Sequence, residues 1–139
     1  MASEECSRLF DELSAYTLTH GGKEFIHQHV VDAYGAQHIG GSPSNIRTAF
    51  SLIGLYLALE KGNTGRQVQI AHMRLARFKR QWPKREQPRD LAKLTVADVL
   101  NAEPGPARDE MILKWATAVW ASWRHAHDWT RQTVTDLLP

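Results

Sequence analysis

The sequence has a single cysteine, Cys6, among its 139 residues. One cysteine cannot form a disulfide within the chain, and it excludes a metal site built from paired CxxC motifs. The sequence also lacks a GxSxG string, a glycine-rich nucleotide-binding motif and an internal repeat. Its acidic start, Met-Ala-Ser-Glu-Glu, differs from the basic start of a signal peptide. We therefore expect a cytoplasmic protein without a disulfide, a CxxC metal site, a GxSxG nucleophile or a glycine-rich nucleotide site.

The chain also lacks a large net charge, because 17 basic residues oppose 15 acidic ones. A net charge of +2 does not by itself imply nucleic-acid binding. The basic residues are nevertheless concentrated in segment 66–89, which contains one acid, Glu86. The basic patch expected there comprises Arg66, Arg74, Arg77, Lys79, Arg80, Lys84 and Arg85. It predicts binding to nucleic acid or another acidic partner, and the alternative is a solvated helix face.

Between Ala49 and Leu59 only Ser51 and Gly54 interrupt an apolar run. This run predicts a central buried helix over about 44–61, with Ser42 as its cap and Pro43 in its first turn. Apolar side chains occur on most sides of this helix, so we expect neighbours around it. It is shorter than the roughly 20 apolar residues that span a bilayer, and no transmembrane segment is expected.

Other stretches repeat apolar residues at steps of three and four, which is the period of a helix. The helices expected beside the central one cover 3–20, 23–38, 63–82, 94–100 and a stretch from 107 that bends or restarts near 128. In the short one, Thr95 and Asp98 have the spacing of a capping box. The sequence therefore predicts an all-α fold, a single-domain bundle (1–139) of five or six helices around the central helix.

Four strings occur in order along most of the chain. They are HQHVVDAYGAQH (27–38), LIGLYLALE (52–60), LTVADV (94–99) and WATAVWASW (115–123). Together they resemble a family of uncharacterised bacterial proteins that carry a domain of unknown function. Many members have an N-terminal CxxC and a histidine just before the LIGL string, where this chain has Cys6 and Ser51. The resemblance implies a fold and a cellular context and no established reaction.

Seven histidines raise the question of a metal site between helices. His27 and His38 would lie roughly 16 Å apart along one helix at about 1.5 Å per residue, so they cannot share an ion. A site for zinc or nickel would then need His27 or His29 and a histidine of the last helix such as His125, with Asp128 or Asp32 completing the ligands. The set expected first is His27, His125 and Asp128. A metal-dependent enzyme resembling the DinB-like bundle hydrolases is one alternative function, by analogy of fold.

Polar residues on the second and central helices predict a pocket between them. Its expected residues are Asp32, Tyr34, His38 and Ser51. The Trp-rich last helix cannot turn Trp115, Trp120 and Trp123 inward unless it is broadly covered, so we consider a homodimer contact there. The leading interpretation is a non-catalytic binding or interaction module. The alternatives are the metal-dependent enzyme and a binder of nucleic acid or an acidic partner through segment 66–89.

Overall fold

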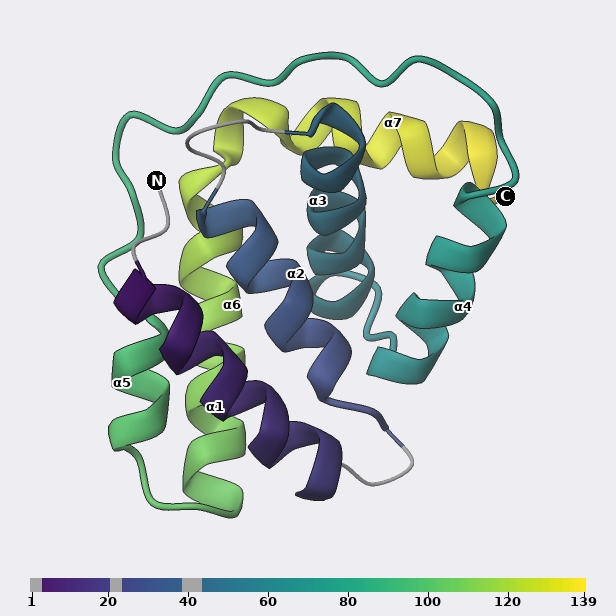
Figure 1. Cartoon of the computed structure of the whole chain (residues 1–139). Coiled ribbons are helices and arrows are strands. Elements are labelled where there is room, and N and C mark those ends of the chain that lie inside the picture. The colour runs from purple at the N-terminus through teal and green to yellow at the C-terminus, as the bar shows by residue number, and fades with distance from the viewer. Residues whose placement is uncertain (1–3, 21–23, 39–43) are drawn as a thin grey trace.

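A computed structural model describes residues 4–20, 24–38 and 44–139 (Figure 1). The helices in these ranges are α1 (Glu4–His20), α2 (His27–Gln37), α3 (Asn45–Leu59), α4 (Gly65–Leu75), α5 (Val96–Asn101), α6 (Pro106–Ser122) and α7 (His127–Leu137). A short 3-10 helix, η1 (Arg124–Ala126), joins α6 to α7. No strand occurs in the ranges described, so the all-α prediction is confirmed.

Helix α3 occupies the centre, as its apolar run predicts. Thr48, Ala49 and residues 51–57 are buried, and α2, α4, α6 and α7 pack around the helix. Its N-terminus is capped by Ser44, whose Oγ accepts a hydrogen bond from the Arg47 backbone N–H at 3.3 Å. The expected cap residues Ser42 and Pro43 lie outside the described residues. A buried central helix with a polar cap is therefore present, and Ser44 supplies that cap.

Helix α2 begins four residues later than the helical period suggests. Phe25 has a φ of +53°, a left-handed conformation that interrupts a helix. The backbone at this break lies against the start of α4, where the Arg66 N–H donates to the Glu24 carbonyl at 3.1 Å. A Cβ on Gly65 would stand 1.8 Å from the Phe25 carbonyl oxygen. Gly65 therefore permits this close approach of two backbones.

Helix α4 ends at Leu75, whereas the apolar spacing predicts a helix as far as Trp82. Residues 76–95, here called the strap, run along the outside of the bundle from α4 to α5 (Figure 1). The Trp82 indole packs edge-on against the Phe50 ring, with centroids 5.5 Å apart. The Gln37 amide donates to the Leu94 carbonyl at 2.7 Å. These contacts hold an extended segment whose apolar residues happen to have a helical spacing.

Helix α5 and the Trp-rich last stretch of helix have the local features that the sequence predicts. The Thr95–Asp98 capping box is present, and the last helix restarts at His127 after the 3-10 turn. Trp115, Trp120 and Trp123 are buried inside the chain. Their indole N–H groups donate to the Gln37 side chain, the Glu60 side chain and the Ala36 carbonyl. The chain itself covers these rings, so they give no reason to expect a dimer contact there.

Candidate functional site

A pocket of about 350 Å³ lies between α2, α3 and α4. It is lined by Gln28, Val31, Asp32, Ile46, Arg47, Phe50, Ser51 and His72. Three of its polar lining residues, Gln28, Asp32 and Ser51, are buried. Ile46 and Arg47 are exposed and form its rim. A small concave site with apolar walls and a few polar groups is the usual form of a ligand pocket.

Asp32 is the residue that distinguishes this pocket. Its Oδ1 accepts one hydrogen bond, from the Gln28 amide at 3.3 Å, and its buried Oδ2 has no partner. The carboxyl fits against α3 because position 54 is glycine, where a Cβ would stand 1.9 Å from Oδ2. Most buried polar atoms in proteins have a hydrogen-bond partner. A buried carboxyl oxygen without a partner, on a residue that lines a pocket, is therefore unusual.

His72 of α4 completes the polar side of the pocket. Its Nε2 lies 2.9 Å from the Phe50 carbonyl oxygen, which can only accept, so Nε2 carries the proton. Its Nδ1 is then an acceptor, 3.4 Å from the Gln28 amide nitrogen. The distance from Nε2 to Asp32 Oδ1 is 3.9 Å. Gln28 therefore donates to both Asp32 and His72 and links α2 to α4.

Burial sets the charge of both ionisable groups. It raises the pKa of Asp32 well above the ordinary value, and the Gln28 hydrogen bond acts in the opposite direction. Burial lowers the pKa of His72, against the effect of the Phe50 carbonyl. Both shifts favour the neutral forms, a carboxylic acid beside a neutral imidazole. Such a pair can donate and accept hydrogen bonds without presenting a charge.

Of the four pocket residues predicted from the sequence, Asp32 and Ser51 line the pocket and the other two do not. Tyr34 and His38 form a stack with Phe10 of α1, with centroid distances of 4.1 and 4.2 Å. Gln28 and His72 also line the pocket, and the sequence does not single them out. His72 could be recognised only as a polar residue on the apolar side of α4, which is a weak signal.

The three predicted metal ligands are not brought together. His27 hydrogen-bonds the Thr17 hydroxyl at 2.9 Å, and His125 bonds the Glu86 carbonyl at 3.0 Å. The first turn of α2, which holds His27, lies far from η1, which holds His125 (Figure 1). Within 4–20, 24–38 and 44–139, no three His, Cys, Asp or Glu residues are grouped so that they could hold a metal ion.

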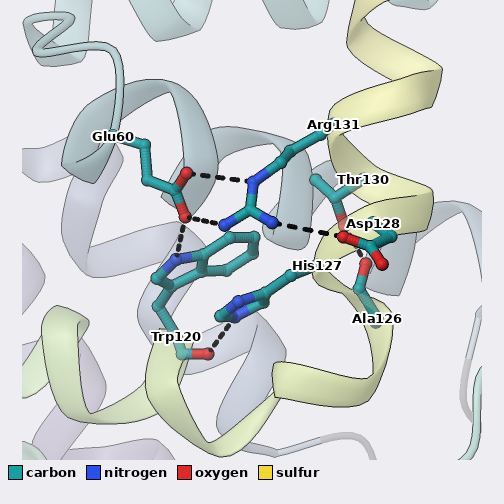
Figure 2. Close-up of polar contacts among 7 residues, drawn as sticks. All are labelled: Glu60, Trp120, Ala126, His127, Asp128, Thr130 and Arg131. Atoms are coloured by element: carbon teal, nitrogen blue, oxygen red, sulfur yellow. Dashed lines mark hydrogen bonds and ion pairs between the residues drawn. The ribbon is translucent and has the colours of Figure 1, made fainter.

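Asp128 instead belongs to a polar cluster that fastens the end of α3 to α6 and α7 (Figure 2). The Arg131 guanidinium lies 3.3 Å from Asp128 and makes two bonds to Glu60, at 3.1 and 3.0 Å. Glu60 also accepts from the Trp120 indole at 2.9 Å. The Arg131 bonds are the main reason that the pKa of Glu60 is lowered. The partner of Asp128 in the structure is therefore Arg131.

Six of the seven expected basic-patch residues are exposed, and Arg85 is half-buried. Three lean on aromatic rings, with Arg66 over Phe25, Arg80 over Trp82 and Arg85 over Trp129. The others are distributed along α4 and the strap. The structure thus spreads these cations over one helix and an extended segment, whereas the sequence suggested a single helix face.

Comparisons with known proteins address the fold family and leave the pocket unassigned. Comparison with curated proteins and with solved structures gave no match. No helix in the described ranges is both long enough and apolar enough to cross a membrane. The model of a family of unknown function (DUF5946) matches residues 1–124. The chain, most of whose length this match covers, therefore belongs to the DUF5946 family.

Proposed function

We propose that the protein is a non-catalytic binding module for a small molecule, held in the pocket between α2, α3 and α4. The observation that carries this proposal is Asp32, a buried carboxyl with one unpartnered oxygen in the wall of the pocket. Leaving such a group unpaired costs stability, and a ligand atom that bonds it removes that cost. The cavity volume of about 350 Å³ lies in the range of small-molecule sites.

The walls define the chemical class of the ligand. Val31, Ile46 and Phe50 offer apolar contact to a compact ring or branched chain. Asp32 in its neutral form can donate to a hydroxyl or carbonyl oxygen, and Arg47 at the rim disfavours a cation. The ligand class that fits is a non-cationic molecule with a compact ring or branched chain and one hydrogen-bonding oxygen.

Binding of small probes tests this proposal. We expect benzyl alcohol, cyclohexanol and benzamide to produce saturable shifts in 1H–15N NMR spectra at pocket residues, with weaker effects from benzylamine because it is a cation. Replacing Ile46 by Trp should fill the pocket mouth and abolish the shifts. Leu113→Trp is a matched control, because Leu113 is 44% exposed and Ile46 47%, and Leu113 lies on α6 away from the pocket.

The two Trp variants give the proposal a clear failure. Shifts that persist in Ile46→Trp, or that scatter over the surface and disappear equally in both variants, would place probe binding elsewhere. Saturable binding in the wild type and in Leu113→Trp, together with its loss in Ile46→Trp, supports the pocket.

A further inference from the structure

The outward face of α4 combines exposed apolar and basic side chains. Ile70, Met73 and Phe78 are 51%, 64% and 43% exposed, and they are three of the seven large hydrophobic side chains found exposed in the described residues. Arg66, Ile70 and Met73 follow one another at steps of four and three, so they lie along one stripe of α4. Arg77 and Phe78 follow in the first residues of the strap. The opposite stripe, with Val68, Ala71 and Leu75, is buried.

The charge around this face has one sign. Segment 61–85 contains no acidic residue. Arg66, Arg74, Arg77, Lys79 and Arg80 are exposed there, and no ion pair in the described parts of the chain involves any of them. Helix α4 packs on α2 and α3 and lies at one edge of the bundle (Figure 1). The outward face of α4 and the first residues of the strap, together called the α4 face (66–80), are therefore free to meet a large negatively charged surface.

The mixture of side chains distinguishes between the classes of partner. Nucleic-acid binding without sequence preference uses stacked aromatic rings. Trp82, however, is buried against Phe50, and aliphatic Ile70 and Met73 occupy the centre of the face. Protein interfaces also use Met and Arg, but this face carries five exposed cations and no acidic residue, a charge of one sign that an anionic surface complements. Helices at a bilayer interface combine apolar side chains that enter the headgroup layer with Arg and Lys that contact anionic lipids.

We propose that the α4 face docks on an anionic lipid surface. Ile70, Met73 and Phe78 enter the boundary between headgroups and acyl chains, while the five cations contact the phosphates and carboxylates of the lipids. Long basic side chains can reach the headgroups while their stems cover apolar surface. Only His72 of α4 lines the ligand pocket, so this inference does not rest on the proposed ligand.

Co-sedimentation with vesicles tests the proposal. Vesicles of phosphatidylcholine alone are compared with vesicles that also contain phosphatidylserine, at low and at high salt. We expect binding that requires phosphatidylserine and falls with salt. Arg74→Gln/Arg77→Gln should weaken it about 30-fold, from about 1 kcal/mol per cation near the surface. Ile70→Ser/Met73→Ser should weaken it about tenfold through lost apolar contact.

Matched controls separate the α4 face from charge and exposed apolar surface elsewhere. Arg89→Gln/Lys93→Gln removes the same charge from exposed positions of the strap beside Asp90, and Leu113→Ser removes an exposed apolar side chain of α6. Both should bind like the wild type, and circular dichroism should show every variant folded. Absence of phosphatidylserine-dependent binding overturns the proposal. So does equal weakening by the controls, or salt-sensitive binding to single-stranded DNA that is tighter than vesicle binding and unchanged in Ile70→Ser/Met73→Ser.

Discussion

Replacing Ile53 by Asp is expected to unfold the chain. Ile53 is fully buried near the middle of α3, the helix that α2, α4, α6 and α7 surround. A carboxyl without a partner in a packed interior costs about 3 to 5 kcal/mol, and the apolar contacts of Ile53 are lost as well. Native proteins have a total stability of about 5 to 15 kcal/mol. Thermal unfolding followed by circular dichroism should show no cooperative transition, or one at a far lower temperature.

Ile70→Asp is the matched control for this substitution, because it makes the same chemical change on an exposed face of α4. Its unfolding midpoint should stay close to that of the wild type. An Ile53→Asp protein that melts cooperatively at the wild-type midpoint would show that α3 is not the core of the bundle.

Gly54→Ala is expected to be strongly destabilising for a change that adds only one methyl group. The new Cβ would lie 1.9 Å from Asp32 Oδ2 and 2.5 Å from its Cγ, so the carboxyl or the two helices must move. Overpacking of this kind costs about 1 to 3 kcal/mol. We expect a loss near the upper end of that range, measured by chemical denaturation, since Asp32 is buried between α2 and α3.

The double variant Asp32→Ala/Gly54→Ala identifies the cause of that loss. Removing the carboxyl leaves room for the methyl group, so the double variant should lose much less stability than the sum of the single losses. Such coupling is expected only for residues in contact. Additive losses, or a Gly54→Ala protein as stable as the wild type, would contradict the close approach of α2 and α3 at the pocket.

The parts of the fold that could be predicted depend on neighbours in sequence. The Thr95–Asp98 capping box and the restart of the last helix are local features, and both are present. The buried run of α3 could also be predicted from the sequence, because apolar side chains cover most of its surface. The end of α4 could not be predicted, because Phe78 and Trp82 keep a helical spacing beyond Leu75. Trp82 in fact packs on Phe50 from the extended strap.

The site could be predicted only in part, for a physical reason. Periodicity shows which face of a helix is apolar, and it does not show which helix lies opposite. Asp32 and Ser51 were found because each interrupts an apolar face, but Gln28 meets His72 across 44 residues of sequence. The same limit applies to the metal hypothesis, because the sequence does not show that the first turn of α2, with His27, lies far from η1, with His125 (Figure 1).

The protonation state of Asp32 is the most direct test of the claim that a buried neutral acid lines the pocket. Its raised pKa means that the folded chain keeps a proton that the unfolded chain releases above about pH 3.8. The contribution of Asp32 to the free energy of unfolding therefore decreases as pH rises from about 3.8 to the raised pKa of the folded chain. A 13C NMR titration follows the Cγ shift of Asp32, with the signal assigned by Asp32→Asn. It should show that the Asp32 carboxyl is still protonated well above pH 3.8. A carboxyl that loses its proton at the ordinary value would contradict a buried neutral acid in the wall of the pocket.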